Sequence, residues 1–186
     1  GRQTDGRGHA ALGSADRSSA PDLIVMQLTV FAVGRMKSGP ERELTGRYLG
    51  RLEKAGPAVG LTFAGVTEIA ESRASDTDRR KADEGAHCLS LAEDRTTALV
   101  AFDEGGKTLS SDEFARWIAR QRDDGRKRAL FAIGGPDGHA PSVLERADLA
   151  VSLGRMTWPH QIARILAAEQ LYRAVSILAG HPYHRQ

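Results

Sequence analysis

Apolar and β-branched residues gather in five stretches along the chain and predict five β-strands. The first, MQLTVFAV at 26–33, alternates apolar and polar side chains, which is typical of a strand. Another, TTALVAF at 96–102, is apolar almost throughout and predicts a strand buried on both faces. The three remaining predicted strands are 61–69, 128–133 and 148–153.

Helical spacing and capping signals fill the intervals between these strands. Pro40 with Glu41 and Glu43 is typical of a first helical turn, and Ser110 with Glu113 has the spacing of a capping box. Glycines follow two of the predicted helices, at 56 and 125. The predicted helices are 40–56, 76–91, 110–125, 141–147 and 159–178, the last with Ile162, Ile165, Leu166, Glu169 and Tyr172 at helical spacing.

Strand and helix alternate five times, which predicts an α/β fold with a mostly parallel sheet and helices on both faces. A length of 186 residues favours one domain, which we place at 26–186. Residues 1–25 are rich in Gly, Ala, Ser, Asp and Arg until shortly before Met26, and we expect a disordered N-terminal extension there.

Three of the predicted strands run directly into glycine-bearing turns. These turns are DEGG at 103–106, GGPDG at 134–138 and GRMTWP at 154–159. In an open α/β sheet, ligands bind just beyond the carboxyl ends of the strands. If the three strands are neighbours, their turns form one crevice lined by backbone donors and acceptors, which suits a nucleoside-like cofactor. An ordinary strand-to-helix turn remains the alternative for each loop.

Composition narrows the class of protein. One cysteine, Cys88, excludes a disulfide framework, and aromatic residues at 5% argue against a stacking platform for single-stranded nucleic acid. No apolar run approaches the roughly 18 residues of a membrane span, so we expect a cytoplasmic protein without a membrane partner. The formal net charge is only +2, but residues 151–186 carry four arginines against one acid. This local positive charge suits an anionic partner such as RNA, and the alternative interpretation is an ordinary solvated helix face.

Several chemistries find no motif in the chain. The lysine and hydroxyl of a P-loop, the full dinucleotide fingerprint and a nucleophile elbow are absent. His160 and His181 lack metal-ligand spacing, so we predict no metal site. The tail HPYHR at 181–185 has two interpretations: Tyr183 packs it down, or it is a polar arm that completes a site and contacts phosphate through Arg185.

Four motifs in order carry a resemblance to a known family. The runs IGGPDG, LGRMTWPHQIAR, EQLYRA and HPYHR resemble the bacterial 23S ribosomal RNA (pseudouridine-N3)-methyltransferase family, the large-subunit rRNA methyltransferase H group of the SPOUT class. The opening MQLTVFAVGRMKSGPERELTGRYLGR matches as well, so the resemblance covers 26–186.

The resemblance implies a C-terminal trefoil knot, a homodimer with its site at the subunit interface, and S-adenosyl-L-methionine as cofactor. Residue by residue, it implies cofactor contacts in the same three turns, at Phe102, Gly134, Leu153, Gly154, Arg155, Met156, Thr157 and Trp158. The tail would help form the RNA site. The implied activity is methylation of N3 of a pseudouridine in 23S rRNA.

The reaction implies a role for the tail, because N3 carries a proton that must leave before a methyl group is accepted. Tyr183 and His184 are candidate bases, and Arg185 is a candidate to stabilise the developing charge. The small basic surface predicts an assembled 70S ribosome as substrate. The rival hypotheses are a non-catalytic ribosome-binding or assembly module and another α/β nucleotide-binding enzyme.

Overall fold

Residues 23–185 are described by the computed structural model, except for the side chain of His184. They form five strands, five α-helices and two short 3₁₀ helices. In chain order these are β1 (Met26–Val33), α1 (Pro40–Ala55), η1 (Gly56–Val59), β2 (Leu61–Ile69), α2 (Thr77–Leu91), β3 (Thr97–Thr108), α3 (Ser111–Asp123), β4 (Arg128–Ile133), α4 (Pro141–Arg146), β5 (Leu149–Ser152), α5 (His160–Leu178) and η2 (Pro182–Arg185). Most of the predicted extension, residues 1–22, lies outside this described range.

All five strands belong to one sheet in the order β2-β1-β4-β3-β5, and every neighbouring pair is parallel. The predicted mostly parallel sheet is thus confirmed and is wholly parallel in this part of the chain. Because the strands share one direction, their carboxyl ends meet at one edge. Strands β4, β3 and β5 are adjacent, so the turns that follow them are brought side by side.

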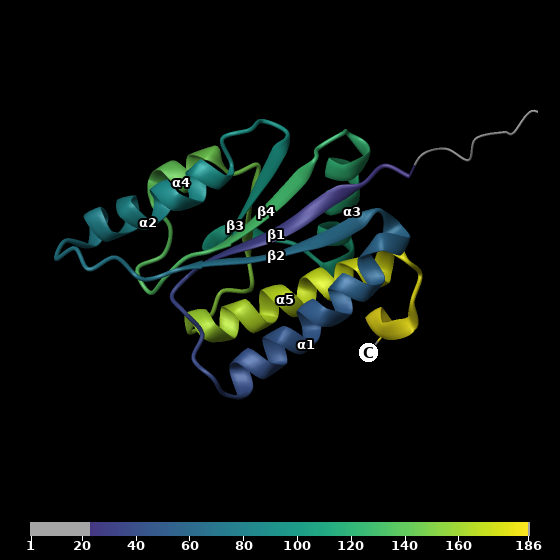
Figure 1. Cartoon of the computed structure of the whole chain (residues 1–186), viewed down its shortest axis with the longest axis horizontal. Coiled ribbons are helices and arrows are strands. Elements are labelled where there is room, and N and C mark those ends of the chain that lie inside the picture. The colour runs from purple at the N-terminus through teal and green to yellow at the C-terminus, as the bar shows by residue number, and fades with distance from the viewer. Residues whose placement is uncertain (1–22, 186) are drawn as a thin grey trace, which may run out of the picture.

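Helices cover both faces of the sheet, as predicted. Helices α2 and α4 lie on one face, and α1, α3 and α5 lie on the other (Figure 1). Alternate residues of one strand enter the two cores: Phe131 of β4 packs with the α1, α3 and α5 side, while Leu130 packs with the α2 and α4 side. This two-sided burial explains why β3 and β4 are apolar over consecutive positions.

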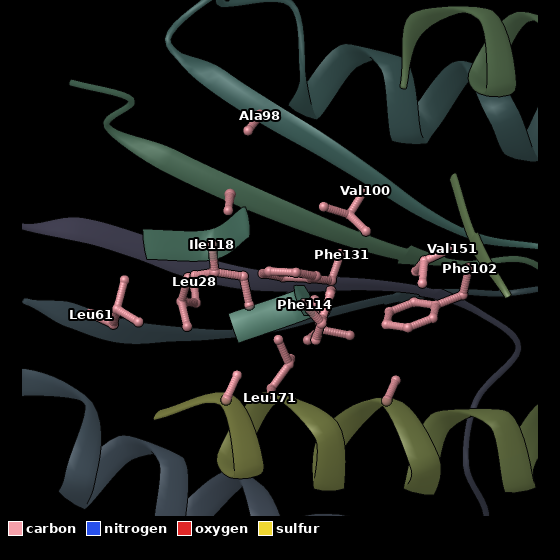
Figure 2. Close-up of a cluster of buried hydrophobic side chains, with 14 of the residues drawn as sticks. Leu28, Leu61, Ala98, Val100, Phe102, Phe114, Ile118, Phe131, Val151 and Leu171 are labelled. Atoms are coloured by element: carbon pink, nitrogen blue, oxygen red, sulfur yellow. The ribbon is translucent and has the colours of Figure 1, made fainter. Parts of the chain in front are cut away.

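The larger core contains a set of edge-to-face aromatic contacts (Figure 2). Phe114 of α3 lies 6.3 Å from the ring of Phe102 and 6.1 Å from the ring of Phe131, centroid to centroid. Leu171 of α5 and Leu28 of β1 are fully buried in the same cluster. Each such side chain contributes about 1.5–3 kcal/mol of transfer free energy. Phe102 stands at the end of this core that faces the carboxyl edge.

Local signals placed most helix ends correctly. The side chain of Asp76 accepts a hydrogen bond from Arg79 N (3.0 Å) and caps α2, while Ser110 and Glu113 form the predicted capping box of α3. Gly85, which disfavours a helix on propensity alone, lies where α2 packs against α4. A Cβ there would lie 3.1 Å from Ala140 Cβ and from Val143 Cγ2, so the close helix contact favours glycine.

Helix α5 buries a different face from the stripe noted in the sequence. Its buried side chains are Arg164, Ala167, Ala168, Leu171, Ala174, Val175 and Ser176. Ile162, Ile165 and Leu166 lie on the opposite side, are half-buried and belong to neither core cluster. The alanines of this face allow α5 to pack closely against α1 and α3, and the bulkier stripe lies outside the buried face.

Candidate active site at the carboxyl edge of the sheet

The turns after β4 and β5 and the distal part of β3 enclose a cavity of about 550 Å³, a volume typical of small-molecule sites. Seven of the eight residues proposed from the resemblance line it: Phe102, Gly134, Leu153, Gly154, Met156, Thr157 and Trp158. The eighth, Arg155, is exposed and does not line it. The structure therefore gathers the three predicted loops in one place, as strand adjacency required.

The prediction for one of these loops was wrong. The DEGG segment was predicted to be a turn that ends its strand, but β3 continues to Thr108. Phe102 and Lys107 both pair with Val151 of β5, so residues 103–106 bulge out of the ladder between them. Gly105 N donates to Asp103 Oδ1 (2.9 Å) within the bulge. The bulge turns Asp103 and Glu104 toward the cavity, which they line.

The glycine loop after β4 closes on itself. Gly138 N donates to Gly135 O (3.0 Å), and Gly138 has a φ of 81°, a conformation that favours glycine. A Cβ on Gly134 would lie 3.0 Å from the carbonyl carbon of Gly138. Both positions therefore need glycine for the loop to keep its shape, which leaves backbone rather than side chain facing the cavity.

An arginine on α2 holds this loop from outside. Arg80 Nε lies 2.7 Å from Asp137 Oδ2, and a second guanidinium nitrogen lies 3.3 Å from Oδ1, a two-pronged pair. The same guanidinium donates to the carbonyls of Ala74 and Ser75. Hydrogen bonding to Arg80 lowers the pKa of Asp137. This ion pair, which clasps the loop, could not be recognised in the sequence, because its two residues are 57 positions apart.

The cavity wall carries more acid than base. Asp103, Glu104 and Asp137 line it against a single lysine, Lys81, and two histidines, His139 and His160. Asp137 is paired with Arg80, but Asp103 and Glu104 form no ion pair within residues 23–185. Such a wall favours a cationic ligand and disfavours phosphate.

The β5–α5 loop lines the same cavity, and Thr157 Oγ1 donates to Glu104 Oε2 (3.5 Å). Ser152 Oγ donates to Gly154 O (2.8 Å) and accepts from Gly154 N (3.1 Å), which fixes the first turn after β5. Met156 and Trp158 beyond it are 74% and 42% exposed although both are apolar. Exposed apolar side chains at a cavity mouth are typical of a surface that a ligand or partner covers.

Comparison with known proteins agrees with this geometry. Residues 26–184 match a protein-family model described as "Predicted SPOUT methyltransferase". The chain belongs to the SPOUT methyltransferase family. It is 61% identical over 160 residues to a protein of Brucella anthropi and 58% identical over 168 residues to one of Brucella abortus, both named ribosomal RNA large subunit methyltransferase H. Each alignment covers 86% of this chain and 99% of the relative.

Two buried polar groups of this SPOUT chain were not foreseen. His139 is 7% exposed, and burial lowers its pKa, so the ring is neutral near pH 7. Glu84 is 5% exposed; burial raises its pKa, although Ser72 N donates to it (2.8 Å). Glu84 thereby links the segment before α2 to the base of the glycine loop. Neither residue lies in a motif that would have singled it out.

The tail lies far from the cavity within one SPOUT chain. His160 at the start of α5 lines the cavity, and the tail follows the other end of this 19-residue helix, about 27 Å away at 1.5 Å per residue. Tyr183 packs on Tyr172 with ring centroids 4.7 Å apart, and its hydroxyl donates to Glu169 Oε1 (3.1 Å). Burial, together with Glu169, raises the pKa of Tyr183, so its phenol stays protonated.

Of the two interpretations of the tail, packing through Tyr183 is therefore the one seen in the structure. Arg185 is exposed, and the side chain of His184 lies outside the described part of the chain. No cluster of three or more metal-ligating side chains occurs among residues 23–185. Within the same residues, no helix is long and apolar enough to cross a membrane.

Proposed function

We propose that this protein transfers a methyl group from S-adenosyl-L-methionine to N3 of a pseudouridine in 23S rRNA, with the assembled 70S ribosome as substrate. The observation that carries the proposal is the glycine-walled, acid-lined cavity of about 550 Å³ in a SPOUT chain. Relatives that match over 99% of their length are named rRNA large-subunit methyltransferases, which supports the RNA substrate. A ribosomal substrate also implies a cytoplasmic protein.

The cavity suits this cofactor in size and charge. The cofactor carries a sulfonium, an ammonium and a carboxylate group, so its net charge is positive, and Asp103 and Glu104 provide negative charge outside any ion pair at the wall. Gly134 and Gly154 offer backbone groups to the nucleoside, while Phe102 and Leu153 offer apolar surface. Met156, Thr157 and Trp158 cover the mouth, with Arg155 at its exposed edge.

When bound, the cofactor supplies an electrophilic methyl group on sulfur. The chain has two tasks: to hold the cofactor in line with the target pseudouridine, and to accept the proton from N3. For N3 to accept a methyl group, a side chain of the protein would have to take up the N3 proton. Tyr183 is a poor base because its phenol stays protonated, so its role is to hold the tail. His184 is left as the candidate base, with Arg185 stabilising the developing charge.

A homodimer would reconcile the tail with the cavity. Ile162, Ile165 and Leu166 give α5 a second apolar face that packs in neither core, and a helix apolar on both sides is ordinarily covered on both. A second copy packed on this face would bring its tail toward the cavity, across the roughly 27 Å that separates them in one chain.

The same proposal includes a trefoil knot in the chain after β3, which would hold the cavity loops together. It also takes 26–186 as one methyltransferase domain and 1–25 as an extension outside it.

The decisive experiment is methyl transfer from labelled cofactor to ribosomes that lack the modification, with 70S particles, free subunits and bare rRNA compared. We expect label on one pseudouridine, identified by mass spectrometry, with 70S particles preferred. Equal labelling of bare rRNA would contradict the 70S substrate. Ribosome binding without cofactor affinity would contradict the enzyme and support an assembly module, and preference for another nucleotide would support the third hypothesis.

Gly134→Arg tests the cavity itself, with Gly46→Arg as the matched control. A Cβ on Gly134 meets the loop backbone at 3.0 Å, whereas Gly46 on α1 has open space around it. Calorimetry is expected to show loss of cofactor binding for the first variant only, with both folded by circular dichroism. Wild-type affinity in Gly134→Arg would place the cofactor elsewhere.

A further inference from the structure

The segment between β1 and α1, residues 34–39, is held rigidly from inside. Gly34 N donates to Ile69 O (2.8 Å), and Met36 N donates to Glu68 Oε2 (3.1 Å). The side chain of Met36 is 7% exposed. Gly34 has a φ of 88°, a conformation that favours glycine. Gly34 and Met36 are therefore buried against the protein, whereas Ser38 is exposed.

A buried arginine completes the support. Arg164 of α5 is 6% exposed, and it donates to Gly34 O (3.0 Å) and to Glu68 Oε2 (2.5 Å). Burial alone would raise the pKa of Glu68, but the bonds from Met36 and Arg164 outweigh it and lower the pKa. Taking an arginine out of water is costly, so the fold commits a substantial interaction to the shape of this turn.

The rigid turn presents two cations to solvent. Arg35 and Lys37 alternate with the anchored Gly34 and Met36, and both are exposed. Neither forms an ion pair with any residue in 23–185. Glu71 lies against Gly34, where a Cβ would be 3.4 Å from its carboxylate, but it does not pair with either cation. The fold thus holds two unneutralised charges at a fixed place.

That place adjoins the cavity. His160 lines the cavity and also contacts the turn, since a Cβ on Gly34 would lie 3.5 Å from His160 Nε2. The cavity wall is acidic and disfavours phosphate, so the backbone of an RNA strand whose base enters the cavity must lie on the rim. Arg35 and Lys37 closely follow Gly34 in the chain, which places them next to His160 at the edge of the cavity.

We infer that the 34–39 turn is an RNA-backbone contact surface, on which Arg35 and Lys37 bind phosphates flanking the target nucleotide. The inference rests on the proposed function and adds the surface that would hold the substrate. Arg164 and Glu68 are positioning residues for it. Because phosphate contacts carry no sequence information, this surface would supply affinity and register rather than choice of nucleotide.

The test compares two double variants with the same loss of charge. Arg35→Ala/Lys37→Ala removes the surface, and Lys127→Ala/Arg128→Ala removes two exposed cations at the amino edge of the sheet, the far side from the cavity. Affinity for ribosomes is measured between 50 and 200 mM KCl. A plot of log affinity against log salt concentration has a negative slope. For the first variant we expect this slope to be shallower than that of wild type by about 1.4–1.8. Raising KCl from 50 to 200 mM should therefore weaken ribosome binding by a factor that is about tenfold smaller than for wild type.

Kinetics separate this surface from the cofactor cavity. In Arg35→Ala/Lys37→Ala we expect KM for ribosomes to rise while kcat and cofactor affinity stay at wild-type values. A wild-type salt slope, or one equal to that of the control, would overturn the inference. Loss of cofactor affinity would overturn it too, because the turn would then act through the cavity. Absence of methyl transfer by wild-type protein would instead count against the proposed function, and the salt slope would still test the surface.

Discussion

Gly106 offers the sharpest test of how the β3 bulge shapes the cavity. A Cβ on Gly106 would lie 2.7 Å from Ala150 C and 2.7 Å from Val151 N, both in the backbone of β5. Ordinary contact begins at 3.4 Å, so in Gly106→Ala the strand must move by about 0.7 Å. Backbone cannot rotate away as a flexible side chain can, and the strand must therefore shift.

Inserting a methyl group into this closely packed place is overpacking, which should lower the free energy of unfolding of Gly106→Ala by about 1–3 kcal/mol. In a chain of this size each kcal/mol lowers the melting temperature by about 2–4 °C. Strand β5 ends at Ser152, and the next residues, Leu153 and Gly154, line the cavity. We therefore expect Gly106→Ala to weaken cofactor binding as well as stability.

Gly105→Ala is the matched control. Its Cβ would meet only Asp103 Oδ1, at 3.1 Å, the end of a side chain that can move. A stability change within about 0.5 kcal/mol is expected. Calorimetric unfolding and isothermal titration with the cofactor measure both effects. Equal melting temperatures and equal affinities for the two variants would refute the claim that the bulge holds β5 in place.

Four further outcomes are expected. Arg80→Ala should weaken cofactor binding by freeing the glycine loop, and Arg80→Lys should restore it only in part because lysine cannot make a two-pronged pair with Asp137; titration calorimetry that finds all three proteins equal would argue against the clasp. Burial raises the pKa of Cys88 to about 12, so Ellman's reagent at pH 8 should react only as the protein unfolds, and rapid native labelling would contradict this burial. Because the pKa of Glu68 is lowered, its ionised form stabilises the fold above the ordinary carboxyl pKa, and this is lost as pH falls through the lowered value; the difference between wild type and Glu68→Gln in urea unfolding should therefore shrink on acidification rather than grow. Leu171→Ala, at a fully buried position, should cost about 2–5 kcal/mol in the same assay, and a loss below 1 kcal/mol would mean that the site collapses around the smaller side chain.

Much of the fold could be predicted because its signals are local. The bounds of β1, β2 and β4 match the expected 26–33, 61–69 and 128–133. Capping by Asp76 and Ser110 depends on residues three positions away, which a sequence displays directly. Alternation of strands and helices predicts a parallel sheet, and therefore loops at one edge. That β4, β3 and β5 are neighbours, which brings the three loops into one crevice, is known only from the structure.

The errors came where non-local pairing overrode local preference. Two consecutive glycines predicted a turn at 105–106, yet β5 pairs with residues on both sides of them and extends β3 to Thr108. On α5 the helical spacing of the large apolar residues was noted, but the spacing did not indicate that an alanine-rich face would be the buried one. Glycine and alanine contribute little to hydrophobic periodicity. Their role at a given position depends on which distant segment packs closely against it.

By itself, the sequence determined the α/β class, the element order, the cavity loops and, through its motifs, the resemblance to a methyltransferase family. Only the tertiary structure decided which charges are paired and which are free. Arg80 clasps Asp137 across 57 positions and Arg164 reaches Glu68 across 96, whereas Arg35 and Lys37 remain exposed. Hydrophobic periodicity is repeated along the chain and can be recognised in one segment, but an ion pair exists only when two distant segments meet.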